Sequence, residues 1–155
     1  MANSSIYRIL EAIQTKVGQD YTSETSGVNL TDRVILGTVG ETVMSPFATV
    51  DFIDYTTEHG LSMGNYRMTA RFEVYVFIGG TTVANRLKNA LNLTSDVIKS
   101  ITSDRFLGLR TEANTIVVDD VLCNFTAVDG DRYGHDGLGI GYIEVVTPFQ
   151  SRTGV

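Results

Sequence analysis

The chain has 155 residues, of which 43% are hydrophobic and 19% are charged, and its formal net charge at pH 7 is −6. This length suits one domain with its own core, and no stretch approaches the roughly 18 consecutive apolar residues of a membrane helix. The acidic balance argues against binding nucleic acid by neutralising phosphates, and the single cysteine, Cys123, excludes an internal disulfide. We therefore expect a soluble single domain over 1–155, made in a cytosol, with no membrane partner.

An amphipathic helix is the first element that the sequence predicts, over residues 4–17, with Gly18 as its stop. Its apolar residues recur at helical spacing and are Ile6, Ile9, Leu10, Ile13 and Val17. Residues 19–45 are rich in Thr, Ser, Gly, Asn and Asp around one short apolar run at 34–36. This composition predicts a long extended arm with at most one short strand, outside a core formed by about 4–17 and 47–147.

Two strands are predicted after the arm. Residues 47–55 alternate between apolar and polar side chains, as in a half-buried strand, and residues 66–78 form the clearest strand of the chain. One face of this second strand carries Met68, Ala70, Phe72, Val74 and Val76, and the other carries Arg67, Thr69, Arg71, Glu73 and Tyr75. The alternation predicts a long antiparallel strand with one face in water.

A second helix is predicted directly after Gly79-Gly80, with Thr81 or Thr82 as its cap and an irregularity near 93–95. The apolar stripe expected to face the core consists of Ala84, Leu87, Leu91, Ile98 and Ile101.

The last predicted elements are a strand over 115–127, a glycine-rich hairpin over 128–139 and a final strand over 140–147 that Pro148 ends. The expected inner face of the first of these strands carries Val117, Val121, Cys123 and Phe125, and a bulge is expected near Asp119-Asp120. The order of elements predicts an α+β fold with an antiparallel sheet of about four to five strands and two helices packed on one face. Residues 148–155 are left as a tail.

The densest group of reactive side chains lies in the 128–139 hairpin and comprises Asp129, Asp131, His135 and Asp136. A calcium loop starting at Asp129 fails because its twelfth position is Ile140, and one histidine with carboxylates is too few strong ligands for structural zinc. Turn chemistry explains these residues, since Gly and Asp are what hairpin turns require. The chain also lacks a nucleophile motif and a phosphate-binding lysine motif. We expect no catalytic, cofactor or metal site and no enzymatic activity.

The polar face of the 66–78 strand has two interpretations: ordinary solvated surface, or part of a subunit interface, where Arg and Tyr are enriched. The predicted interface residues are Arg67, Arg71, Glu73, Tyr75, Asp131, Arg132, Tyr133 and Phe149. If the protein assembles, apolar side chains should be exposed near Tyr75, Phe77 and Pro148-Phe149.

The layout of an N-terminal helix, a long RMTARFEVYVF strand, a turn into the TTVANRLKNAL helix and two closing strands resembles the tail-terminator and tail-completion proteins of long-tailed bacteriophages. The resemblance covers about 4–17 and 47–147, and the 19–45 arm and the 128–139 hairpin do not match it. It implies helices on an antiparallel sheet and a homo-oligomeric ring, a hexamer, located in the tail or neck of the virion.

The resemblance also implies partners. Such a ring caps the tail tube protein, docks to the head-tail connector or stopper protein, and in some phages contacts the tail sheath, while DNA passes through without specific binding. The alternatives are another neck or tail component, such as a tube or connector subunit, or a monomeric binding module. The ring function and the binding module differ in native mass, because only the ring is a multiple of the chain's 16.9 kDa.

Overall fold

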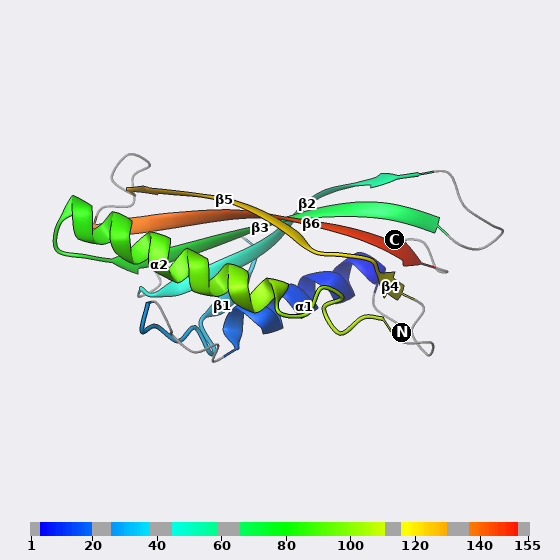
Figure 1. Cartoon of the computed structure of the whole chain (residues 1–155), viewed down its shortest axis with the longest axis horizontal. Coiled ribbons are helices and arrows are strands. Elements are labelled where there is room, and N and C mark those ends of the chain that lie inside the picture. Colours follow the sequence, from blue (N-terminus) through cyan, green and yellow to red (C-terminus); the bar gives the residue numbers. More distant parts are fainter. Residues whose placement is uncertain are drawn as a thin grey trace.

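The fold is seen in a computed structural model that describes residues 4–19, 26–37, 45–58, 66–110, 116–129 and 137–151. The elements are α1 (Ser5–Gly18), β1 (Val34–Leu36), β2 (Phe47–Thr57), β3 (Tyr66–Gly79), α2 (Val83–Thr102), β4 (Ile116–Val118), β5 (Leu122–Asp129) and β6 (Leu138–Ser151). Both helices pack against the same side of the sheet (Figure 1). The α+β fold and its helix layer are therefore as the sequence predicted.

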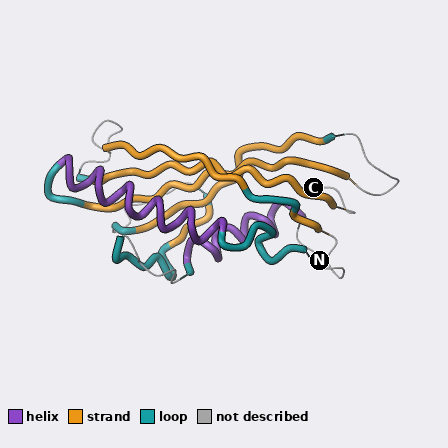
Figure 2. The backbone as a smooth tube through the Cα atoms, viewed as in Figure 1, coloured by secondary structure: helices purple, strands orange, loops and turns teal. Residues whose placement is uncertain are grey.

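The sheet has six strands in the order β1-β2-β3-β6-β4, and β5 also pairs with β6. Figure 2 shows the strands as one layer with the two helices along one side of it. Most pairs are antiparallel, but β1 runs parallel to β2, so the sheet is mixed rather than purely antiparallel. β4 pairs with residues 149–151 of β6 and β5 pairs with residues 139–146. The two short strands thus act as one edge strand, interrupted at 119–121, where the sequence predicted a bulge.

The interruption changes which residues of this edge strand face inward. Ile116 and Val118 are fully buried before it, while Val121 is buried after it. The predicted inner residue Val117 is only half-buried, because the residues inserted at 119–121 shift the alternation by one position. The prediction was correct for Val121 and wrong for Val117.

Pro148 does not end the last strand, as the sequence predicted, because β6 continues to Ser151. Pro148 pairs with Thr69 of β3 and lies opposite the interruption between β4 and β5, where a missing N–H is least costly. Its carbonyl oxygen still accepts a hydrogen bond of 2.9 Å from the N–H of Asp119. The predicted 148–155 tail is therefore part of the sheet as far as residue 151.

Helix α1 begins where the sequence predicted. The side chain of Ser4 caps it by accepting a hydrogen bond from the N–H of Tyr7, and Ile9, Ile13 and Val17 are buried against the sheet and α2. Its start is joined to the end of β6 by a hydrogen bond of 2.8 Å between the hydroxyls of Ser5 and Ser151.

Helix α2 begins at the predicted cap, Thr82, but it is continuous through 93–95 and presents a different face to the sheet from the one expected. Of the expected stripe, Leu87 and Leu91 are exposed, and Ile101 is buried. The buried face instead consists of Arg86, Ala90, Leu93, Thr94, Asp96, Val97, Ser100 and Ile101.

Two glycines of β6 explain this orientation of α2. A Cβ atom built on Gly139 would lie 2.2 Å from the carbonyl oxygen of Arg86, and one built on Gly141 would lie 1.8 Å from Oγ1 of Thr94. The helix therefore lies directly against the backbone of β6, with small side chains at the contact. An apolar count along the helix cannot detect this requirement, because it is set by residues of another strand.

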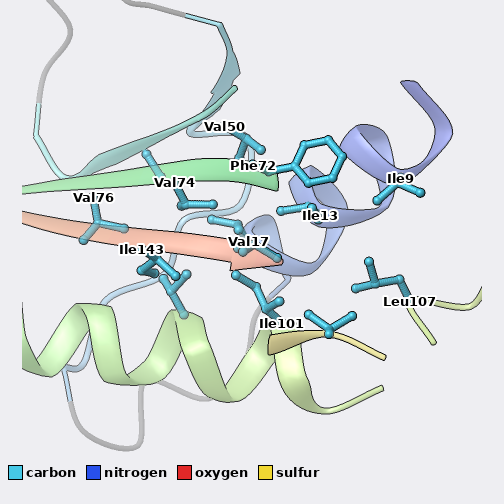
Figure 3. Packing of buried hydrophobic residues seen from close by; sticks show 14 of the residues in the cluster. Ile9, Ile13, Val17, Val50, Phe72, Val74, Val76, Ile101, Leu107 and Ile143 are labelled. Atoms are coloured by element: carbon cyan, nitrogen blue, oxygen red, sulfur yellow. The ribbon is translucent and has the colours of Figure 1, made fainter. Parts of the chain in front are cut away.

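The core lies between the helices and the inner face of β2, β3 and β6. Figure 3 shows Val17 and Ile101 of the two helices beside Phe72 and Ile143 of the sheet. Phe72 and Phe149 are the largest fully buried side chains.

Residues 26–37 of the predicted arm pack against this body. Leu30 is buried, and Oδ2 of Asp96 accepts hydrogen bonds from the N–H and the hydroxyl of Ser26 at 2.8 and 2.6 Å. The side-chain amide of Gln14 donates to the carbonyl oxygen of Val34 at 3.1 Å. This part of 19–45 is integrated in the fold rather than extended from it, because its few apolar and hydrogen-bonding groups are satisfied by α1 and α2.

Candidate functional site

The face of the sheet opposite the helices is the candidate functional surface. Among the described residues no helix covers it, and its side chains form rows across neighbouring strands, because directly paired residues point to the same side. From one end to the other the rows are apolar, aromatic, acidic and arginine-containing.

The acidic row joins three strands. Asp51 of β2 pairs with Glu73 of β3, and Glu73 pairs with Glu144 of β6. Like charges placed directly opposite one another are destabilising. Partial burial of Glu73, together with the charge of Asp51, raises the pKa of the Glu73 carboxyl. The sheet thus carries an electrostatic cost at its centre.

The next row contains Arg71, which is committed to a partner on its own sheet. Nε and Nη2 of Arg71 donate to the two carboxylate oxygens of Asp54 at 2.7 and 2.5 Å, while Nη1 lies 4.0 Å from Glu144. This hydrogen bond lowers the pKa of Asp54. The side chains of Arg71 and Asp54 are 42% and 48% exposed, so water screens their attraction, and Arg71 compensates the acidic row only at one end.

On the other side of the acidic row lies an aromatic pair. The rings of Tyr75 and Tyr142 are 5.0 Å apart and tilted by 52°, and burial followed by the charge of Glu73 raises the pKa of both phenols. Beyond them Phe47 stacks on Phe77 at 4.6 Å, in a small cluster with Ile140. Because Phe47, Phe77 and Ile140 are buried, the partly exposed aromatic side chains of the face are the two tyrosines, which lie beside carboxylates that, among the described residues, only Arg71 partly compensates.

The structure brings together four of the predicted interface residues and places Phe149 apart from them. Arg67, Arg71, Glu73 and Tyr75 share the open face, as the alternation predicted, and their role in an interface stays a prediction. Asp131, Arg132 and Tyr133 lie outside the described residues.

Phe149 requires a correction. Its side chain is fully buried in the core, because it pairs with the inward-facing Met68, so it is not available on the surface. Phe77 is also buried, at 8% exposed, in contrast to the exposed apolar side chain expected there.

Several exposed apolar side chains lie on or beside α2, whereas Leu122 of β5 pairs with Val146 and so lies on the open face, in the row of Arg71. Among the larger ones are Val83, Leu87, Leu91, Leu122 and Phe125, which are 38–55% exposed. Leu87, Leu91 and Phe125 were predicted to lie in the core. For the two leucines, the signal that could have placed them outside was the Gly139 and Gly141 pair, which requires small residues on the helix in contact with it. Phe125 pairs with Ile143 on the covered side, but it lies on β5, which pairs with β6 alone.

The reactive side chains of the described residues can be compared with the sequence-based expectations. They contain no group of three or more His, Cys, Asp or Glu side chains that could hold a metal ion, and burial raises the pKa of the Cys123 thiol to about 11. A thiol of that pKa is protonated at neutral pH and is a poor nucleophile. Asp131, His135 and Asp136 of the hairpin fall outside the described part of the chain, and Asp129 is the last residue of β5.

In the part of the chain that is described, no helix is long and apolar enough to cross a membrane.

The chain is similar to known proteins in fold but not in sequence. No protein-family model matches the chain, and no curated protein matches it in sequence. Among solved structures, the chain is similar to one from the virion of a native gene transfer agent particle, with a TM-score of 0.52 and 8% identity. The likeness covers 96% of this chain and 98% of that chain. At this identity it shows a shared fold over essentially the whole of both chains.

Proposed function

We propose that this chain is a structural protein of a phage-like virion, and that within this class it is a tail terminator. The observation that carries the proposal is the fold shared, end to end, with a chain of a gene transfer agent virion. The likeness covers 96% of this chain and 98% of that chain, so it involves the helices as well as the sheet. The order of elements that resembles tail-terminator proteins supports the narrower role.

The proposed mechanism is geometric rather than catalytic. Copies associate head to tail through two different surfaces, and a fixed rotation per copy closes the contact into a ring of about six subunits. The ring ends the tail tube on one side and receives the head-tail connector on the other. The open sheet face, with its carboxylates and exposed guanidinium groups, has the mixed polar and aromatic character of a surface that meets other protein.

The same fold also suits another neck or tail component, such as a tube or connector subunit. These roles differ in closure: a terminator forms a single closed ring, whereas a tube subunit stacks ring upon ring. The proposal includes the absence of enzymatic activity, because the role requires only surfaces.

Native mass tests the proposal. Light scattering after gel filtration, over a hundredfold range of protein concentration, should give a closed oligomer near six times 16.9 kDa, and negative-stain images should show single rings. Long tubes would favour the tube subunit. A monomer at every concentration, with no rings in the images, would contradict the ring and favour a binding module.

A further inference from the structure

The outer surface of α2 is cationic in an otherwise acidic protein. Lys88, Leu91, Ser95 and Lys99 follow one another at spacings of three or four residues, so they form one stripe along the helix, pointing away from the sheet. Both lysines are exposed, and Leu91 is 41% exposed. The other charged residues of α2, Arg86 and Asp96, are buried on the opposite side. The exposed surface of α2 thus carries two positive charges and no negative charge.

The open sheet face has the opposite sign. Asp51, Glu73 and Glu144 line up across three adjacent strands, and the neighbouring Arg71 is already bonded to Asp54. The protein as a whole has a net charge of −6, so the positive stripe on α2 is a local departure from its overall charge. The two surfaces lie on the outer sides of the two layers of one body, and each copy therefore presents both.

We infer that the α2 stripe of one copy docks on the carboxylate row of a second copy. The inference rests on the proposed ring and adds which surfaces meet in it. Charge complementarity selects a second copy, because within the described residues every copy carries three carboxylates with Arg71 as a partial counter-charge at one end, and two exposed ammonium groups on α2. Since the two surfaces differ, the contact is head to tail, as ring closure requires.

The dimensions of the two surfaces are close enough for the lysines to reach the carboxylates. Lys88 and Lys99 are eleven residues apart, or about 16 Å along a helix that rises 1.5 Å per residue. The carboxylate row spans three strands, or roughly 10 Å at a strand spacing of about 4.8 Å. The flexible four-carbon stems of the lysines cover the difference. Leu87 and Leu91 then come against the ring faces of Tyr75 and Tyr142, which border the carboxylates.

Carbodiimide cross-linking tests this contact directly, because it joins an ammonium group to a carboxylate only where the two already touch. Equal amounts of ¹⁴N- and ¹⁵N-labelled protein are mixed, cross-linked and digested, and peptides of mixed isotope report links between copies. The inference predicts mixed-isotope links from Lys88 or Lys99 to Asp51, Glu73 or Glu144. A ring without such links overturns the assigned surfaces and leaves the proposed function intact. A monomer without them overturns both.

Charge reversal supplies the second test, with concentration-dependent light scattering as the readout. Lys88→Glu combined with Lys99→Glu should raise the concentration for half-assembly more than roughly tenfold, since like charges then meet. Lys16→Glu is the matched control, because Lys16 lies in the last turn of α1 as Lys99 lies in the last turn of α2, and it should leave assembly unchanged. Glu73→Lys combined with Glu144→Lys makes the net charge of the row positive, and this protein should restore assembly when it is mixed with the double variant. Normal assembly of the double variant, with an unchanged melting temperature, would overturn the inference.

Discussion

The two faces of this sheet are built from alternate residues of the same strands, yet they are held in different ways. On the covered face of β3 and β6, Val74, Val76 and Ile143 are fully buried, and Gly139 lets α2 approach the backbone. On the open face the same strands place carboxylates opposite one another without a matching number of cations. The covered face therefore specifies the fold, and the open face retains an electrostatic cost that a partner can relieve.

The largest expected effect on stability comes from adding a side chain at the point where α2 lies against the backbone of β6. Gly139→Ala should lower the free energy of unfolding by roughly 3 kcal/mol, because the new methyl group would overlap the backbone carbonyl of Arg86, and no side-chain rotation relieves that overlap. Urea unfolding measures it. Gly18→Ala is the control, since its Cβ would lie at an ordinary 3.5 Å from Val34, and it should be neutral or slightly stabilising. Equal stability of the two variants would mean that α2 does not lie on the glycines.

A smaller effect is expected where residues 26–37 attach to the covered side. Asp96→Ala removes the acceptor for the N–H and the hydroxyl of Ser26, and it should cost about 2 kcal/mol. Hydrogen exchange should show the amide of Val28 losing protection before the strands do, because its N–H bonds to the Ser26 hydroxyl. Asp96→Asn keeps an acceptor oxygen and should lose less. Unchanged exchange at Val28 in the alanine variant would contradict the attachment.

On the open face, a substitution is expected to raise the free energy of unfolding rather than lower it. Glu73→Gln should stabilise the isolated subunit by about 0.5 kcal/mol, because it removes the charge that faces both Asp51 and Glu144. Thermal unfolding under dilute conditions measures it, with the exposed Glu58→Gln as a control that should show no change. A loss of stability in Glu73→Gln would show that the carboxylate is compensated within the subunit.

The smallest expected effect is on the pH dependence of the free energy of unfolding, to which Glu73 and Asp54 contribute with opposite signs. The pKa of Glu73 is higher in the folded state, so the folded state binds more protons than the unfolded chain between the ordinary and the raised values. The contribution of Glu73 to the free energy of unfolding therefore increases as the pH falls from neutral into the range where glutamate carboxyls titrate. The pKa of Asp54 is lowered, so its stabilising pair with Arg71 is lost at still lower pH. Glu73→Gln should remove the rise and keep the later loss, as read from unfolding at a series of pH values.

The sequence predicted the covered and open faces of β3 because alternation is a local property of one strand. It placed Arg67, Arg71, Glu73 and Tyr75 on one side for that reason. It could not predict the acidic row, since Asp51 and Glu144 are brought beside Glu73 only by the register of strands distant in sequence. Phe149 was misplaced because the sequence ended the last strand at a proline that β6 accommodates opposite a break in its neighbour.

The orientation of α2 was missed for a related reason. Its apolar residues are numerous enough to suggest more than one buried face. The choice between these faces depends on Gly139 and Gly141 of β6, which lie far along the chain from their contacts Arg86 and Thr94 on α2. The parallel pairing of β1 likewise depends on how 26–37 packs against the helices. Local patterns predicted the elements, and contacts between distant elements decided how each one is turned.

The glycines of β6 have a consequence for any assembly of this chain. They bring α2 down onto the sheet and so set the thickness of the body between its outer helix surface and its open sheet face. If copies meet through those two surfaces, this thickness is the repeat distance from one copy to the next, and the circumference of a ring is proportional to it. Residues that look like packing details inside one subunit would then determine the diameter of the opening at the centre.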